Sequence, residues 1–189
     1  RNIPGYLARL KAQDMASIER IYTDCPAIYR EINDYMPKLC QDGLLKFYKD
    51  DALSLSTLYH IRGNMDELLN SKVWLPSGAN IIIETLETLT VIDVNSGKNQ
   101  SRKEDTILRI NLEAAREIAR QLKLRNISGI IIVDFINLKS QEQKEELIRC
   151  IRQELKKDTV PAQFIDITRL GLVELTRKKV YKSLREILQ

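Results

Sequence analysis

The sequence predicts an α/β protein in which a mixed sheet is layered with helices. Strand-like and helix-like segments alternate from residue 105 to residue 189, a pattern typical of layered sheets. Long β-rich runs begin near residue 72, after a region of shorter elements. Charged residues make up 30% and hydrophobic residues 43% of the chain, which favours an ordinary globular protein over a disordered or membrane protein.

The N-terminal region predicts short helices and strands in alternation. The stretch "ASIERIYTD" is typical of a helix end that leads into a short strand. Asp24 and Pro26 suit the start of a helix across "CPAIYREINDYMPKL". A strand in "LLKFYKD" and a helix across "LSTLYHIRGNMDELLNS" follow.

The middle region predicts three strands. The stretch "SKVWLPSGANIIIETLETLTVIDVNSG" contains a strand up to Leu75, a second at residues 80–84 and a third at residues 89–95. Proline, serine and glycine at residues 76–78 predict a turn between the first two strands.

The C-terminal region predicts helices and strands in turn. Apolar residues recur at helical spacing over about residues 105–124, which predicts an amphipathic helix. The continuous apolar run in "NISGIIIVDFIN" predicts a strand buried on both faces. A charged helix at residues 141–157, a strand in "AQFIDI" and a basic helix from about residue 171 to the end complete the prediction.

Three global features narrow the function classes. The net charge of +4 is too small to indicate nucleic-acid binding by itself. Cys25, Cys40 and Cys150 are odd in number and widely spaced, without a CxxC motif, which argues against a disulfide framework or a zinc site. No apolar stretch is long enough to cross a bilayer and no leader stands at Arg1, so we expect a fragment of a cytoplasmic protein.

Two aspartates at two strand ends are the main candidates for a chemical function. Asp93 in "LTVIDVNSG" and Asp134 in "GIIIVDFIN" each lie at or near the end of an apolar strand, with an asparagine shortly after. Open α/β sheets bind ligands beyond the carboxyl ends of their strands, so the two acids meet in one crevice if their strands are neighbours. Two carboxylates with amide oxygens nearby suit Mg²⁺ or Mn²⁺, which can activate a water for phosphodiester cleavage.

The spacing alone leaves a structural alternative open. An aspartate at a strand end often caps the next helix or holds a turn, and "DVNSG" is suitable turn chemistry without any ligand. The carboxylate needs a partner in either case, because an unpaired charge next to an apolar strand is costly.

Three motifs in a fixed order carry a resemblance. They are "KVWLPSGANIIIETLETLTVIDVNSGK", "INLEAAREIARQLKLRNISGIIIVDFINL" and "TRLGLVELTRKK". Together they strongly resemble the catalytic region of the bacterial ribonuclease E/G family. The match is dense from about Lys72 to Lys179, and weaker similarity in "RIYTDCPAIYREI" and "FYKDDALSLSTLYHI" extends it over most of the chain.

The resemblance implies a Mg²⁺-dependent endoribonuclease that cuts single-stranded RNA in RNA processing and decay and leaves a 5′-phosphate and a 3′-hydroxyl. It implies that Asp93 and Asp134 bind the catalytic Mg²⁺ and that Asn95 assists them. The family architecture implies part of an RNase H-like subdomain at residues 1–87 and a DNase I-like catalytic subdomain at residues 88–189.

Several family features are missing or altered in this sequence. The OB-fold RNA-binding domain, the 5′-monophosphate sensor and the CPxC zinc-link motif have no counterpart, so a zinc-bridged dimer is not implied and other oligomers stay open. "KNQSRKED" replaces a glycine-rich acidic insert, Asn137 replaces an aspartate, and "PSGA" replaces "PSGG". Two alternatives therefore stay open: a catalytically weak or inactive RNA-binding scaffold, and a purely structural α/β domain.

Basic residues near the two acids are candidate ligands of RNA phosphates. They are Lys98, Arg102 and Lys103 after the first aspartate motif, and Arg169, Arg177 and Lys178 in the basic C-terminal segment. Such cations would make RNA binding strongly dependent on salt. For the C-terminal residues, a solvated helix face that covers apolar surface is the alternative.

Aromatic residues and the single histidine are weaker candidates. Trp74, Tyr59 and Phe135 have the chemistry to stack on bases, although aromatic residues in or beside apolar strands more often belong to the core or flank it. His60 has no serine or cysteine partner pattern, and we interpret it as structural.

Overall fold

The computed structural model describes residues 5–13, 15–97 and 104–188. The chain divides into two compact units between Met65 and Asp66. Within the described residues, no helix has the length and apolar character needed to span a membrane.

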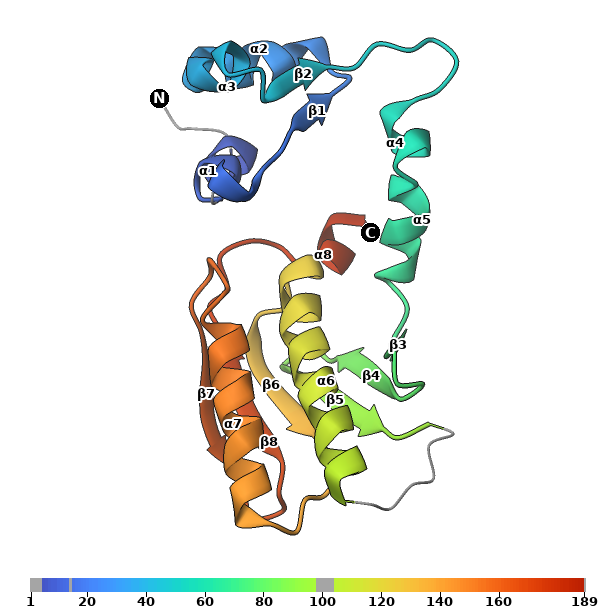
Figure 1. Ribbon diagram of the computed structural model, residues 1–189, viewed down its shortest axis with the longest axis vertical. Helices are drawn as coiled ribbons and strands as arrows, with labels where there is room; N and C mark the ends of the chain where they lie inside the picture. The colour runs from blue at the N-terminus through green and yellow to red at the C-terminus, as the bar shows by residue number, and fades with distance from the viewer. Residues whose placement is uncertain (1–4, 14, 98–103, 189) are drawn as a thin grey trace. The chain divides into compact units, whose positions relative to one another are not determined.

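The first unit is a small cluster of helices around a two-stranded parallel sheet (Figure 1). Its elements are α1 (Gly5–Lys11), η1 (Met15–Ser17), β1 (Ile21–Thr23), α2 (Pro26–Tyr35), α3 (Pro37–Gln41), β2 (Leu45–Phe47), α4 (Leu55–Leu58) and most of α5 (Ile61–Glu67). Its core consists of Leu7, Ile32, Leu39 and Leu45. Helix α2 begins after Cys25 rather than after Asp24, and Pro26 occupies its first turn as predicted.

The second unit contains one mixed sheet of six strands within the described residues. The strands are β3 (Lys72–Trp74), β4 (Asn80–Thr85), β5 (Leu89–Asn95), β6 (Gly129–Asp134), β7 (Ala162–Ile167) and β8 (Val173–Arg177), in the spatial order β3-β4-β5-β6-β8-β7. Strands β5 and β6 are parallel, and each other neighbouring pair is antiparallel. The chain therefore leaves β5 and β6 at the same edge of the sheet.

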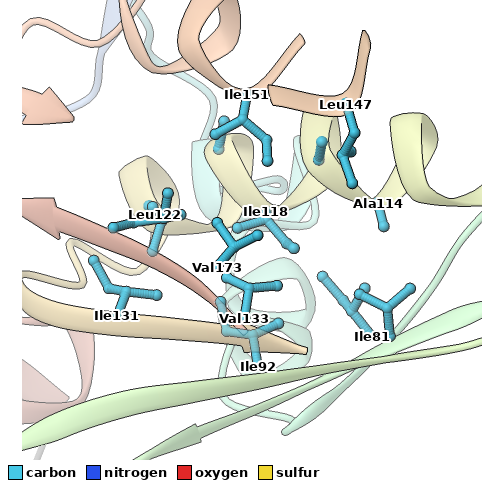
Figure 2. Packing of buried hydrophobic residues seen from close by; sticks show 14 of the residues in the cluster. Ile81, Ile92, Ala114, Ile118, Leu122, Ile131, Val133, Leu147, Ile151 and Val173 are labelled. Atoms are coloured by element: carbon cyan, nitrogen blue, oxygen red, sulfur yellow. The ribbon is translucent and has the colours of Figure 1, made fainter. Parts of the chain in front are cut away.

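Two long helices cover one face of this sheet. Helices α6 (Glu104–Leu124) and α7 (Gln141–Leu155) lie side by side over the strands, and the short helix α8 (Leu184–Leu188) follows the last strand (Figure 1). Side chains such as Ile92, Val133 and Val173 point from the strands toward Ile118 and Ile151 on the helices (Figure 2). Burying these side chains on one face fixes the strand register, since a shift by one residue would turn every one of them outward.

The other face of the sheet, which we call the open face, carries the alternate residues of each strand. The register places Trp74, Asn80 and Asn95 in one row across β3, β4 and β5. Asp93 and Asp134 lie in the next row, on β5 and β6. Among the described residues of the open face, only Asn80 is buried, so the face keeps most of its side chains accessible to a ligand.

The predicted fold class is confirmed, and one predicted element differs. The two compact units divide after Met65, and β4 and β5 pair along six residues within the second unit. The predicted basic helix from residue 171 is wrong, because residues 173–177 form β8. Burial of Val173, Leu175 and Arg177 on alternate positions produces a strand, and this period of two overrides the helical preference of its charged residues.

Candidate metal centre

Asp93 and Asp134 lie beside each other at the end of the sheet that we call the acid edge. They are direct partners in the parallel register of β5 and β6. Neighbouring strands are about 4.8 Å apart, and partners on parallel strands direct their side chains to the same face. Asp93 is half-buried and Asp134 is exposed, so the carboxylate pair faces solvent at the edge of an otherwise apolar sheet.

Asn95 is the third predicted residue that the fold brings to the acid edge. Its side-chain Nδ2 donates a hydrogen bond of 2.7 Å to Oδ2 of Asp93. The alternation along β5 places both side chains on the open face, two residues apart. The bond orients the Asp93 carboxylate and occupies its Oδ2 atom.

A buried asparagine on α6 holds the chain that follows Asp134. Asn111 is fully buried, with an exposed fraction of 0%. Its Nδ2 donates to the carbonyl oxygen of Ile136 at 2.7 Å, and its Oδ1 accepts from the Ile136 amide at 3.1 Å. Sequence reasoning missed this residue, although a signal was present: Asn111 is a polar residue on the apolar stripe of an amphipathic helix.

The loop after β5 is fixed by a close backbone contact with the β3–β4 turn. Gly97 has a φ of +63°, and a Cβ atom at this position would lie 2.2 Å from the carbonyl oxygen of Gly78. The same turn is attached to α6, because the Ser77 amide donates to Oε1 of Glu113 at 3.2 Å. Two residues of the "INLEAA" motif, Asn111 and Glu113, therefore hold the two loops that flank the acid pair.

The donor set at the acid edge fits a hard divalent cation. Asp93 and Asp134 supply two carboxylates, and Asn95 supplies an amide oxygen. Within the part of the chain that the structure describes, no cluster of three or more histidine, cysteine, aspartate or glutamate side chains is arranged to hold a metal. Mg²⁺ keeps several of its waters and commonly takes only one or two carboxylates from a protein, so this small set suits it better than it suits Zn²⁺.

The predicted phosphate ligands occupy different places. Lys98, Arg102 and Lys103 lie outside the described residues. Arg169 is exposed in the turn between β7 and β8, which is closed by hydrogen bonds from Thr168 to Leu172 and from Gly171 to Thr168. Strand β8 begins opposite Val133, so this turn stands at the acid edge next to the end of β6.

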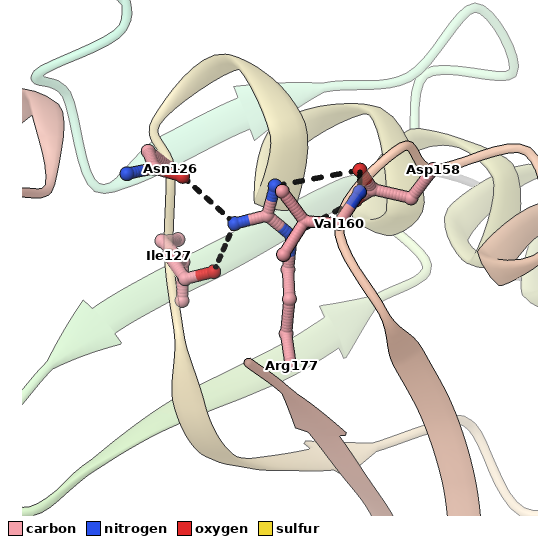
Figure 3. A network of polar contacts seen from close by, with 5 residues as sticks. All are labelled: Asn126, Ile127, Asp158, Val160 and Arg177. Carbon is pink, nitrogen blue, oxygen red and sulfur yellow. Dashed lines mark hydrogen bonds and ion pairs between the residues drawn. The ribbon is translucent and has the colours of Figure 1, made fainter. Parts of the chain in front are cut away.

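The position of Arg177 argues against the prediction that this residue contacts RNA. Its guanidinium is buried at the other end of β8, where it forms an ion pair of 2.8 Å with Asp158 and donates to Oδ1 of Asn126 and to the carbonyl oxygen of Ile127 (Figure 3). The Arg177 and Asp158 side chains are each only 4% exposed. Lys178 is exposed but follows Arg177, about 15 Å along the strand from the acid edge.

The predicted aromatic candidates differ in how far they are exposed to solvent. Phe135 is half-buried and packs against the main core, which agrees with a structural role. Trp74 differs, because the residue is 64% exposed although it belongs to a strand.

A mixed α/β sheet with two carboxylates at the ends of adjacent parallel strands is typical of proteins that bind a divalent cation at the carboxyl edge of the sheet. Residues 7–180 match the model of the Ribonuclease E/G family, and the chain belongs to this family. A ribonuclease E of Synechocystis sp. is 42% identical over 183 residues, which cover 93% of this chain and 27% of that protein.

Two further relatives are similar over nearly the same part of the chain. A chloroplastic ribonuclease E/G-like protein of Arabidopsis thaliana is 33% identical over 96% of this chain and 19% of its own length. A ribonuclease G of Salmonella typhimurium is 34% identical over 92% of this chain and 36% of its own length. The chain thus spans between about a fifth and about a third of the length of these relatives.

Proposed function

We propose that the chain is the catalytic region of a Mg²⁺-dependent endoribonuclease that cuts single-stranded RNA in RNA processing and decay. The observation that carries the proposal is the register of β5 and β6, which puts Asp93 beside Asp134 with Asn95 hydrogen-bonded to Asp93. Membership of the Ribonuclease E/G family supports RNA as the substrate. In this proposal, residues 88–189 form the DNase I-like catalytic subdomain and residues 1–87 form part of an RNase H-like subdomain.

Each residue of the site has a distinct task in this proposal. Asp93 and Asp134 hold Mg²⁺, with Mn²⁺ as the cation of similar preference. Asn95 fixes the orientation of the Asp93 carboxylate through its 2.7 Å hydrogen bond. When bound, Mg²⁺ supplies an activated water and neutralises charge on the phosphate that is cleaved.

Basic residues hold the RNA backbone in this proposal. Arg169 stands in the β7–β8 turn at the acid edge. Lys98, Arg102 and Lys103, which lie outside the described residues, follow Gly97 in the sequence. Each phosphate contact releases counterions, so binding weakens steeply as salt increases. Arg177 and Lys178 have no part in this surface, since one is buried and both lie at the other end of β8.

The test is cleavage of a labelled single-stranded RNA oligonucleotide by the 189-residue chain with and without Mg²⁺. We expect Asp93→Asn and Asp134→Asn to abolish Mg²⁺-dependent cleavage. The matched control is Glu174→Gln, which removes another carboxylate from the same open face, one strand away from β6. Cleavage by both aspartate variants at the rate of the wild-type chain would refute the proposal.

Measuring the stability of the chain as a function of Mg²⁺ concentration helps to distinguish an enzyme from an RNA-binding scaffold. Mg²⁺ that binds only the folded protein raises its stability in proportion to ln(1 + [Mg²⁺]/Kd). The enzyme hypothesis expects this increase in the wild-type chain and its loss in Asp93→Asn. RNA binding that survives both aspartate substitutions, without cleavage by the wild-type chain at high concentration, would favour the scaffold.

A further inference from the structure

We propose that Trp74 is a stacking platform for a base of the RNA strand, next to the cleavage site. The inference rests on the proposed function and adds a binding residue to it. Trp74 is 64% exposed, and the register places it on the open face of the sheet. A tryptophan ring combines a large apolar face with a polar N–H group, and tryptophan is enriched where proteins bind partners.

The sheet register places Trp74 near the acid pair. Trp74 is the direct partner of Asn80, and Asn80 is the direct partner of Asn95. Two strand spacings therefore separate Trp74 from Asn95, which is a distance of about 10 Å. The nucleotides next to a phosphate bound at Asp93 and Asp134 can span this distance, so a base beside the cleaved phosphate can reach the indole.

The charge next to the indole complements a nucleotide. The Nζ atom of Lys72 lies 4.2 Å from the centre of the Trp74 ring, in a cation–π contact. An aromatic side chain that stacks on a base next to a cation that attracts the phosphate backbone is the arrangement with which proteins bind single-stranded nucleic acids. Lys72 and Trp74 are alternate residues of β3 and lie on the same face of the sheet.

A buried acceptor lies between the indole and the acid edge. Asn80 is only 5% exposed, and its Oδ1 atom has no hydrogen-bond partner within the described residues. An unsatisfied buried acceptor is unfavourable, and a donor group of a bound base would relieve this cost after a small rotation of the amide. Along this row, Trp74 offers a stacking surface and Asn80 offers an acceptor. Asn95 comes next and is hydrogen-bonded to Asp93.

The single tryptophan makes the proposal directly measurable. Trp74 is the only tryptophan of the chain, so its intrinsic fluorescence reports on contact with a base. We expect saturable quenching when a single-stranded RNA is added in the presence of EDTA, which prevents Mg²⁺-dependent cleavage. An RNA of the same length without bases keeps the phosphates and tests whether the base itself causes the quenching.

Variants then relate the contact to affinity, measured by the anisotropy of a labelled RNA. Stacking on one aromatic residue accounts for about a 5- to 150-fold difference in affinity, so Trp74→Leu is expected to lose that much and Trp74→Phe to recover most of it. The control is Ile130→Ala, which removes an exposed apolar residue from the far end of the same open face. The RNA without bases should bind the wild-type chain and Trp74→Leu equally.

The outcomes distinguish this proposal from the proposed function. Asp93→Asn should lose cleavage but keep the fluorescence quenching, because it leaves Trp74 intact. RNA cleavage by the wild-type chain without quenching, and with unchanged affinity in Trp74→Leu, would overturn the stacking proposal alone. A wild-type chain that neither binds nor cleaves RNA would overturn both.

Discussion

The two ends of the central sheet use charged residues in opposite ways. At the acid edge, Asp93 and Asp134 stand side by side, and within the described residues the hydrogen bond from Asn95 occupies only one of their four carboxylate oxygens. At the other end, Arg177 and Asp158 form a closed, buried ion pair, and Arg177 also bonds to Asn126 and Ile127. The closed network satisfies its buried charges and stabilises the fold, whereas the carboxylates of the acid edge keep spare hydrogen-bonding capacity among the described residues.

Opening the closed network is expected to have the largest effect on stability. Arg177→Leu leaves Asp158 as a buried charge without its partner, which should lower the free energy of unfolding by about 3–5 kcal/mol. Urea unfolding followed by Trp74 fluorescence measures the change in the second unit, which contains this residue.

An exposed ion pair provides the control for this substitution. Lys157→Met breaks the pair with Glu154 in which the lysine side chain is 58% exposed, and the expected change is below about 1 kcal/mol. The double substitution Arg177→Leu with Asp158→Leu should recover much of the lost stability, because no buried charge remains. Equal stability of Arg177→Leu and Lys157→Met would remove the distinction between the two ends of the sheet.

The sequence predicts the strands that carry the acids better than the segment that carries Arg177. The apolar runs before Asp93 and Asp134 are strong strand signals, and both predicted strands are present at these positions. In residues 173–177, two charged residues and the following lysines suggested a helix. The strand is selected by contacts with β6 and β7, which lie far away in the sequence.

The same limit applies to the site. The two aspartates could be predicted as a pair because each ends a buried strand, and parallel neighbours bring such ends together. The role of Asn111 could not be predicted, since its partner Ile136 is 25 residues away and belongs to an irregular loop. Local patterns therefore identify the two aspartates, whereas the residues that position the neighbouring loops depend on tertiary contacts.

The next largest effect on stability is expected from the two hydrogen bonds with which Asn111 holds the loop after Asp134. Asn111→Ala leaves both the amide and the carbonyl group of Ile136 without their partner, at a cost of about 2–4 kcal/mol in total. It should also weaken Mg²⁺ binding by about 10- to 100-fold, as losses of supporting hydrogen bonds do at other metal sites. Mg²⁺ titration of stability measures this second effect.

The control for Asn111 lies on the same helix. Gln121 is also buried, and it bonds to Glu117 and Arg125 near the C-terminal end of α6. Gln121→Leu should reduce stability without changing the affinity for Mg²⁺. A similar loss of Mg²⁺ affinity in both variants would mean that Asn111 acts through general stability and not through the Asp134 loop.

A smaller difference is expected between two glycines at the two ends of the sheet. Gly97 and Gly129 both have positive φ, but an added Cβ would meet the Gly78 carbonyl at 2.2 Å in the first case and no atom within 4 Å in the second. Gly129→Ala should cost about 1–2 kcal/mol from backbone strain alone. Gly97→Ala should cost about 1–3 kcal/mol more, because the two backbone segments must separate. Gly97→Ala should also lower RNA cleavage. If Gly97→Ala and Gly129→Ala lost the same stability and the same cleavage, the close contact between Gly97 and Gly78 would be contradicted.

The smallest effect is expected at the carboxylate pair, and its sign is the informative part. Without Mg²⁺, Asp134→Asn removes the repulsion between adjacent like charges and should raise stability by about 0.2–1 kcal/mol. With Mg²⁺, the wild-type chain should become the more stable of the two, since only it retains both ligands. Glu174→Gln is the matched control, because it relieves the similar pair with Asp166 and should leave the response to Mg²⁺ unchanged. Urea unfolding in EDTA and in Mg²⁺ measures both signs. If Asp134→Asn were less stable than the wild-type chain in EDTA, the two carboxylates would not repel each other. They would instead belong to a closed network like that of Arg177.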